Sequence, residues 1–547
     1  MLEKLKKNQD ILLPLAAVLI VFFRRWILID KGINYEEAKD IECFKKIASG
    51  EIPYRDFWWL YGPFPLYFFG FFFKWPGVEG FLFPRCAVMI LTLVGACFSY
   101  LISRFYLSPK WSFLACLFAS SGFVANVHTY GHAFGLTGQI LTFYFLLLHV
   151  SEQNDKRLLT AGGFCGMAIL SKPLGLGSST FAAVFLYLLF DFVFVKRGSP
   201  KKFLYFTLST LAVSLAFYFP LAVVTPLLKI NESLNPLFYV YNLAPSPLKS
   251  LPPVFPFEIF TADSFTSAIQ ILNQHLAYNL RWWMIILAVI FGAFYLLRSL
   301  KENKWRFAKE PQCLFVLLAF AFFFEFQLIV LNNGTAPYVS MLPTYILLLV
   351  FAEQIKDRLY FAAPVYIFLS ALFLAQFVYS PLKYFFFYKN HGTPLALHAA
   401  ENIQVSPYQK KMYGDITEYI QNNTEQSERI VVADYNSMFA LLSQRKDLFS
   451  ENWMIFGGTS FHPYNNQATP PNMKTLFRER EIVERIEKGN PKLILIPNRY
   501  LESPNKVFSP FLEYIKSKWE KVKVFEEGGM TVGIDYDLGV SVFTKKS

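Results

Sequence analysis

Long apolar runs, separated by short polar segments, fill the first two thirds of the chain. Apolar runs that approach about 20 residues form helices that cross a bilayer. The sequence predicts about eleven such spans, which cover residues 11–29, 84–102, 111–125, 134–150, 158–170, 174–195, 203–224, 282–297, 313–331, 338–352 and 359–379. The pattern therefore predicts a polytopic α-helical membrane protein.

The charges of the segments between the spans alternate along the chain. Every second segment is basic, and the residues concerned are Arg104, Lys110, Lys156, Arg157, Lys196, Arg197, Lys201, Lys202, Arg298, Lys301, Lys304, Arg306, Lys309, Lys356 and Arg358. Cytoplasmic loops carry such an excess of positive charge, and lysines before the first span place the N-terminus on the same side. The loops 30–83 and 225–281 and everything after residue 379 are then predicted to be extracytoplasmic.

The region from residue 380 onward has a different pattern, in which short apolar runs alternate with stretches of helical period. Predicted helices cover 408–421, 476–488 and 511–518, predicted strands cover 429–433, 493–496 and 522–525, and 531–543 has the pattern of a hairpin. Strands that alternate with helices predict a layered α/β domain. The chain is thus divided into a transmembrane domain, 1–379, and an extracytoplasmic α/β domain, 380–547.

Composition supports the membrane location and narrows the function. The chain is 54% hydrophobic and 18% aromatic, and its mean hydropathy is +0.33. A net charge of +12 is compatible with nucleic-acid binding, but the basic residues lie between the spans, as membrane topology requires. The six cysteines form no CxxC pair, which argues against a zinc or redox site. Neither a glycine-rich phosphate loop nor a GxSxG or HExxH motif occurs.

An acidic stretch with helical period follows the first span and contains Glu36, Glu37 and Asp40. Glu36 and Asp40 are four residues apart, so they share one face of a helix. Like charges on one face repel, and the spacing indicates a partner: a cation, a metal or a substrate proton. The alternative is a purely structural role, because the dipole of a helix stabilises acidic residues in its first turn.

Three further residues have the chemistry of a binding site. Lys172 lies at the predicted external end of a span, where it can bind phosphate or extend toward the membrane interface. His128 and His132 are four residues apart in the predicted loop 126–133, a spacing that metal ligands use. Since no third ligand lies nearby in the sequence, ordinary interfacial histidines are the alternative.

Several motifs, taken in order, resemble the GT-C membrane glycosyltransferases. They are the acidic pair after the first span, GEIPYRDFWWLYGP at 50–63, Arg85 at the start of the next span, GMAILSKPLGL at 166–176 and APYVSMLPTYILLL at 336–349. The most similar group is the bacterial family 39-like enzymes, which include protein mannosyltransferase and aminoarabinose lipid A transferase relatives. The helix and strand order of the C-terminal region also resembles the extracytoplasmic domain of that group.

The resemblance implies a polyprenyl- or dolichyl-phosphate sugar donor, an external active site and an acidic catalytic residue in the first loop. Glu36 and Glu37 match the family's Asp-Glu pair, Arg55 lies in its Tyr-Arg-Asp segment and Lys172 in its Leu-Thr-Lys-like segment. The predicted catalytic residues are Glu36, Glu37 and Asp40, and the predicted ligands of the donor phosphate are Arg55, Arg85 and Lys172.

This assignment fits the chemistry of sugar transfer from a lipid phosphate. The phosphate leaves as a charged group, so the enzyme needs cations to stabilise it and a base for the acceptor hydroxyl. The predicted function is an inverting transferase for a hexosyl or pentosyl group in cell-envelope glycosylation. Its partners would be the lipid-linked donor, membrane lipid and a lipid, glycan or protein acceptor, and no nucleic acid.

The sequence departs from the family at two points. Glutamate replaces the usual aspartate at position 36, and the segment near 128–137 lacks the second acidic residue that some members carry. Both departures argue against a metal-assisted mechanism, and a divalent cation is left open as a cofactor. The alternative function is a transporter or flippase of a lipid-linked glycan, for which internal repeats and broken spans are expected, and no internal repeat is found. A membrane-bound glycoside hydrolase with paired carboxylates would leave the multi-span body unexplained.

Overall fold

The computed structural model of the protein describes most of the chain. The described residues are 9–33, 35–57, 59, 61–125, 130–195, 199–225, 260–261, 264, 267, 271, 280–304, 308–331, 341–355, 359–374, 380–433, 438–449, 479–498, 501, 509–526 and 539–546. For some helical residues, Glu36 among them, only the backbone belongs to this description. The predicted loop 225–281 lies almost wholly outside it.

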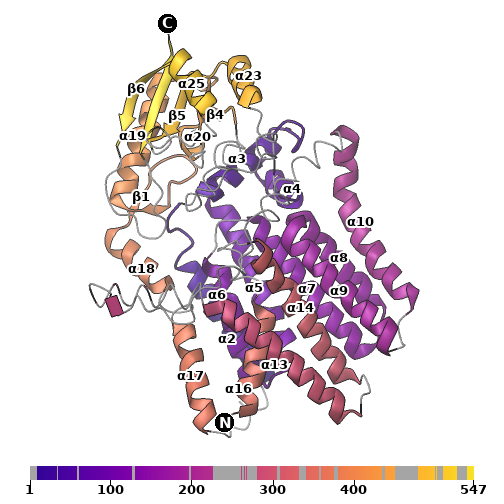
Figure 1. Cartoon of the computed structure of the whole chain (residues 1–547). Coiled ribbons are helices and arrows are strands. Elements are labelled where there is room, and N and C mark those ends of the chain that lie inside the picture. The colour runs from indigo at the N-terminus through magenta and orange to yellow at the C-terminus, as the bar shows by residue number, and fades with distance from the viewer. Residues whose placement is uncertain are drawn as a thin grey trace.

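A bundle of long apolar helices forms the larger part of the molecule (Figure 1). Its helices are α2 (Gln9–Trp26), α5 (Leu82–Ser103), α6 (Pro109–Ala125), α7 (Tyr130–Glu152), α8 (Lys156–Ser171), α9 (Ser178–Phe190), α10 (Pro200–Val224), α13 (Leu280–Glu302), α14 (Lys309–Leu331), α16 (Leu342–Ile355) and α17 (Leu359–Phe373). Two π-helical turns, η1 (Pro173–Gly177) and η2 (Asp191–Val195), precede and follow α9. Each predicted span overlaps one of these elements.

Within the described residues, five helical segments are long and apolar enough to cross a membrane. They are Leu82–Ser103, Tyr130–Glu152, Gly175–Val195, Pro200–Val224 and Trp283–Glu302. The predicted class, a helical membrane protein with several spans, is therefore confirmed. The number of eleven crossings and the side on which each end of the chain lies remain predictions.

Helix α10 shows how the sequence produces both a lipid-facing and a packed surface. Its exposed apolar side chains recur every three or four residues and are Leu204, Leu208, Leu211, Leu215 and Phe219. Such a stripe suits contact with lipid, which supplies no hydrogen bonds. The other face packs on α8, where a Cβ on Gly162 would lie 1.9 Å from the Ser209 Oγ. Glycine at this position allows the two backbones to approach closely.

Two short helices, α3 (Tyr35–Ala48) and α4 (Phe64–Phe72), cap one end of the bundle (Figure 1). Phe44 of α3 packs against Phe69 of α4, with ring centroids 4.7 Å apart, and against Tyr130 of α7, at 5.5 Å. At nine residues, α4 is too short to cross a bilayer. We call this end of the bundle the α3 end.

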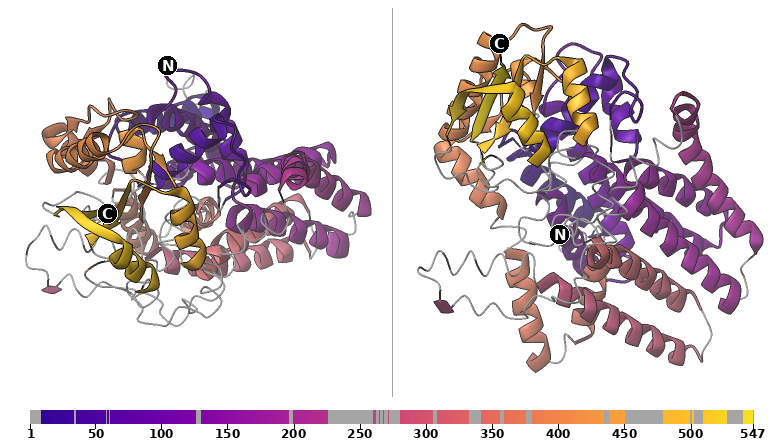
Figure 2. Two further views of the ribbon diagram at one scale, coloured as in Figure 1. Left: turned by 90° about the horizontal axis from the view of Figure 1, so that it is seen from above. Right: turned by 45° about the horizontal axis from the view of Figure 1, so that its top comes forward.

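The C-terminal region contains a five-stranded sheet with helices packed on it (Figure 2). Its elements are α18 (Ser380–His391), β1 (Thr393–Pro394), β2 (Gln404–Val405), α19 (Pro407–Asn423), β3 (Arg429–Val432), α20 (Met438–Ser443), β4 (Lys446–Asp447), α23 (Glu479–Gly489), β5 (Leu493–Pro497), α25 (Ser509–Lys518), β6 (Trp519–Phe525) and β7 (Val540–Lys545). The strand order is β4-β3-β5-β7-β6, with β3 parallel to β4 and β5 and with β7 antiparallel to both neighbours.

The elements predicted for this region from hydrophobic periodicity are present. The three predicted helices correspond to α19, α23 and α25, and the three predicted strands to β3, β5 and β6. The predicted hairpin at 531–543 lies largely outside the described residues, and its described end belongs to β7, which pairs with β6. The division of the chain into two domains at residue 379 remains a prediction.

The C-terminal region docks on the α3 end through main-chain and apolar contacts. Gly32 donates to the Gln404 carbonyl at 2.8 Å, and Gln404 donates to the Asp30 carbonyl at 2.7 Å. One continuous apolar core includes residues of α3, α4, α19, α20, β3 and β5. Two buried carboxyls lie in this docked region, Glu42 on α3 and Asp447 on β4. Burial raises the pKa of both groups.

Candidate functional site at the α3 end

The carboxylate of Glu37 is buried and held by groups from two other helices. Arg85 Nε and Nη2 donate to its two oxygens at 2.7 and 2.6 Å, and the Tyr130 hydroxyl donates at 2.6 Å. The same guanidinium donates to the carbonyl oxygens of Ile29 and Gly32 at 2.8 and 2.7 Å. A bidentate pair of this kind is strong and directional. It therefore fixes the first turn of α3 against the starts of α5 and α7.

One turn further along α3, Lys39 and Asp40 are also buried, at 5% and 1% exposure. The Lys39 Nζ lies 3.3 Å from the Asp40 Oδ1. It also lies 5.5 Å from the ring centre of Trp59 and 5.3 Å from that of Tyr61. Aromatic faces attract cations, and lysine is almost never buried without partners. Helix α3 thus carries a positive charge into an aromatic environment beside an acidic group.

The aromatic segment after α3 is shaped by its own hydrogen bonds and by close packing on α8. Tyr54 has a positive φ of 67°, and its hydroxyl donates to the Tyr61 carbonyl at 2.6 Å. The Trp59 indole donates to the Gly62 carbonyl at 3.0 Å. A Cβ on Gly62 would lie 1.9 Å from the Leu170 carbonyl oxygen, so this close approach requires glycine. The segment therefore presents Tyr61 at the C-terminal end of α8.

Lys172 lies at that end of α8 and is 4% exposed. Its ammonium contacts the Nε2 of His132 and lies 5.7 Å from the centre of the Tyr61 ring. The π-helical turn η1 begins at the next residue, and such turns are frequent at functional sites. His132 belongs to the first turn of α7, so the predicted loop at this position is wrong. Apolar periodicity of the start of α7 is weak, which explains the error.

Arg55 has a different environment from the buried cations. Its side chain is 41% exposed and donates from Nε and Nη2 to both oxygens of Asp56 at 2.8 Å. This hydrogen bond with Asp56 raises the pKa of Arg55 above its usual value. Exposed ion pairs contribute little to stability, so Arg55 remains available to exchange its partner for a substrate group.

The structure thus separates the residues that the sequence placed in one site. Lys172, Lys39 and His132 meet around the ring of Tyr61. Glu37 and Arg85 form a separate, mutually paired cluster. The side chain of Glu36 and all of His128 lie outside the described residues. Lys39, Tyr61 and Tyr130 were not predicted as site residues from the sequence. Lys39 has one signal that could have identified it, because it is three residues from Glu36 and shares its helix face.

The donor groups of this cluster suit an anion better than a metal ion. The described part of the chain contains no group of three or more His, Cys, Asp or Glu side chains able to hold a metal. Ammonium groups have only donors, three on each nitrogen, and two of them lie against one aromatic ring here. Such an arrangement attracts a group with several negatively charged oxygen atoms, such as a phosphate.

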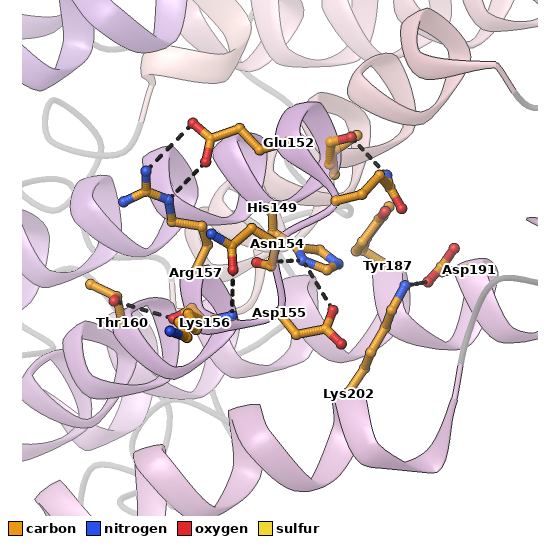
Figure 3. A network of polar contacts seen from close by, with 12 residues as sticks. His149, Glu152, Asn154, Asp155, Lys156, Arg157, Thr160, Tyr187, Asp191 and Lys202 are labelled. Atoms are coloured by element: carbon orange, nitrogen blue, oxygen red, sulfur yellow. Dashed lines mark hydrogen bonds and ion pairs between the residues drawn. The ribbon is translucent and has the colours of Figure 1, made fainter.

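A second polar network includes His149, near the other end of α7 from His132, and is drawn in Figure 3. Lys202 of α10 donates to Asp191 of η2 at 2.8 Å, and both side chains are buried. His149, near the end of α7, has its Nδ1 at 3.1 Å from the Asn154 carbonyl and 3.6 Å from an Asp155 carboxylate oxygen. We call this group of residues the opposite-end network.

Comparison with solved structures identifies the fold. The chain matches the oligosaccharyltransferase of Archaeoglobus fulgidus in its apo form with a TM-score of 0.52, over 90% of this chain and 70% of that one. It matches ArnT from Cupriavidus metallidurans bound to undecaprenyl phosphate with a TM-score of 0.51, over 98% of both chains. Identity is 13% in both cases, a level at which the likeness concerns the fold. The fold is that of the GT-C membrane glycosyltransferases, which confirms the resemblance predicted from the sequence.

Sequence comparison gives a partial match to one family model. The family model described as dolichyl-phosphate-mannose-protein mannosyltransferase matches residues 61–222. The matched segment includes Arg85, Tyr130, His132 and Lys172, and it begins after α3. No protein of curated function matches the chain by sequence.

Proposed function

We propose that this protein is an inverting glycosyltransferase that uses a polyprenyl-phosphate sugar and an acceptor hydroxyl at the external membrane face. Two GT-C structures of the same fold support a lipid-phosphate donor. One is ArnT bound to undecaprenyl phosphate, and the other is the AglB oligosaccharyltransferase with an inhibitory peptide and a dolichol-phosphate. The acceptor class is a lipid, a glycan or a protein.

Lys172 is the principal ligand of the donor phosphate in this proposal, and Lys39, which also pairs with Asp40, supplies further positive charge beside it. Both ammonium groups lie within 6 Å of the centre of one aromatic ring, at 5.7 and 5.3 Å. Their burial lowers the local dielectric constant and strengthens attraction for an anion. As the sugar leaves, negative charge grows on the bridging oxygen, and fixed cations stabilise that charge. This buried pair of lysines is the observation that carries the proposal.

Glu36 is the proposed base for the acceptor hydroxyl. Helix periodicity places position 36 on the face of α3 that also carries Lys39 and Asp40. The acceptor oxygen attacks the anomeric carbon while Glu36 takes its proton, and the bond from that carbon to the phosphate oxygen breaks with its electron pair on the phosphate. One displacement of this kind inverts the anomeric centre. A neighbouring carboxylate such as Asp40 favours the protonated form of a base.

Glu37 and Arg85 have a positioning role in this proposal. Each satisfies the other through two hydrogen bonds of 2.6–2.7 Å, and Arg85 is 2% exposed. A guanidinium so engaged would have to break these bonds to bind a phosphate. Together with Tyr130, the pair sets the orientation of the first turn of α3 and hence of position 36. Arg55, which is exposed, remains a proposed phosphate contact at the rim.

A direct test uses the purified protein and a panel of polyprenyl-phosphate sugars, with release of the lipid phosphate as the signal. For at least one sugar of the panel, we expect release of the lipid phosphate that requires an added acceptor extract. Lys172→Met should abolish most of it, while Lys156→Met should not, because Lys156 is an exposed residue at the other end of the same helix. Movement of a lipid-linked glycan across vesicles without sugar transfer would support the transporter instead.

A further inference from the structure

The contact between Lys172 and His132 determines the protonation state of the histidine. A lysine ammonium has three donors and no acceptor. Its contact with the imidazole Nε2 therefore requires a lone pair on that nitrogen. A neutral imidazole with a lone pair on Nε2 carries its single proton on Nδ1. His132 is thus held in the tautomer that has an N–H at Nδ1.

The Nδ1 of His132 is buried and has no hydrogen-bond partner in the part of the chain that the structure describes. Nearly all buried donors in native proteins are satisfied, and an exception calls for a physical reason. A functional ligand that supplies the acceptor is one such reason. The Nδ1–H of His132 is then available to donate a hydrogen bond to such a ligand.

The surroundings of the imidazole indicate what kind of acceptor fits. Its ring lies 6.0 Å from the ring of Tyr61, centroid to centroid, in an edge arrangement. The ammonium groups of Lys39 and Lys172 lie against the same ring. An acceptor that satisfies an N–H and is also attracted by two cations is an anion with several oxygens. A phosphate monoester or diester meets this description, whereas a sugar hydroxyl satisfies only the N–H.

We infer that His132 is a third ligand of the donor phosphate, which it binds through its Nδ1–H while Lys172 keeps the imidazole neutral. This inference rests on the proposed function, since it assigns a further residue to the same phosphate. Lys172 then has two roles, because it attracts the phosphate and selects the histidine tautomer. His132 contributes a directed hydrogen bond to a charged group without adding a third positive charge.

Two variants of His132 distinguish the role of Nδ1 from the role of Nε2. An asparagine amide nitrogen takes the place of Nδ1, whereas a glutamine amide reaches the place of Nε2. His132→Asn therefore retains the proposed phosphate donor and His132→Gln removes it, although glutamine can still accept from Lys172. The full-length protein in lipid nanodiscs would be titrated with undecaprenyl phosphate and, separately, with undecaprenol.

The expected wild-type result is a clear preference for undecaprenyl phosphate over undecaprenol. His132→Gln should reduce that preference about tenfold or more, as expected for one hydrogen bond to a charged group, and His132→Asn should stay within about threefold of wild type. Equal weakening of both lipids in both variants would indicate a structural role and overturn the inference. Unchanged preference in His132→Gln would overturn it as well.

The titrations, read together with the transfer assay on the sugar panel, distinguish failure of this inference from failure of the proposed function. If the wild type prefers the phosphate lipid but transfers no sugar from the panel, the transferase proposal fails and the phosphate site is still judged by the two variants. If the wild type shows no preference for the phosphate lipid, the phosphate site itself fails, and the role of His132 fails with it.

Discussion

The two ends of helix α7 each carry a histidine close to a lysine of a neighbouring helix, but their chemistry differs. At the α3 end, the ammonium of Lys172 contacts the imidazole of His132. At the opposite end, Lys202 contacts the carboxylate of Asp191, and His149 contacts a carbonyl and the carboxylate of Asp155 (Figure 3). A carboxylate neutralises a lysine, whereas an imidazole accepts a hydrogen bond and brings no negative charge.

This difference separates a structural ion pair from the proposed phosphate site. The pair of Lys202 and Asp191 joins α10 to η2. The cluster of Lys172, His132 and Lys39 combines cations with aromatic rings and leaves a buried N–H of His132 without a partner among the described residues. Both ends include a π-helical turn, η1 or η2, so this turn alone does not mark the site. The partners of Lys172 and Lys202, an imidazole and a carboxylate, are the more informative feature.

The largest effect is expected at position 36. Replacing Glu36 by Gln keeps size and hydrogen bonding but removes the base, so turnover should fall roughly a hundredfold or more, with unchanged thermal unfolding. Initial rates of lipid-phosphate release measure the turnover. A variant that keeps most of its turnover would remove Glu36 from the mechanism.

Glu37→Gln is the matched control and should act on stability instead. It breaks a buried ion pair with Arg85 whose side chains are at most 1% exposed, and such losses cost about 3–5 kcal/mol. Reduced expression and a lower unfolding temperature are expected. Normal stability together with lost turnover would reverse the two roles.

The next largest effect compares the two lysines directly. Lys172→Met should raise the donor KM about tenfold or more, because a charge-assisted hydrogen bond to the phosphate is lost. Lys202→Met should leave KM unchanged and lower stability by about 3 kcal/mol, because the buried carboxylate of Asp191 loses its partner. Steady-state kinetics gives the donor KM of each variant, and thermal unfolding gives the stability of each variant. Equal behaviour of the two variants would contradict the distinction between the ends.

A smaller effect concerns pH and the docked C-terminal region. Burial raises the pKa of Glu42 and of Asp447, so the native state holds these protons more tightly than the unfolded chain does. The two protonated carboxyls contribute fully to stability below their pKa values in the unfolded chain, which are about 4. This contribution is lost as the pH rises through their raised pKa values in the native state. Unfolding temperature should therefore fall from mildly acidic toward neutral pH. Asp447→Asn should flatten this dependence, and an unchanged slope would argue against the assignment.

The smallest effect is expected at Arg55. Its side chain is exposed and paired with Asp56, and exposed pairs of this kind are weak. Arg55→Ala should raise the donor KM by less than about fivefold and leave kcat and stability unchanged. An effect as large as that of Lys172→Met would place Arg55 within the phosphate site.

The sequence was sufficient for features that depend on local periodicity and insufficient for those that depend on distant pairing. The spans and the helices and strands of the C-terminal region follow from hydrophobic period alone. Arg85 was assigned to the phosphate because its charge and position suggest it, but its pairing with Glu37, 48 positions away, is decided by how α3 packs on α5. Lys39 was missed because a lysine among acidic residues is ordinary on a solvated helix. Only the packing of Trp59 and Tyr61 shows that it is buried.

The main-chain pairing of Lys31 with Gln404 also has a consequence for biogenesis. Membrane proteins are inserted as they are translated, from the N-terminus onward, and contacts between distant parts of a chain form late. The segment before α3 obtains its β-sheet partner only after about 370 further residues have been made. This pairing therefore forms only after about three quarters of the chain has been translated.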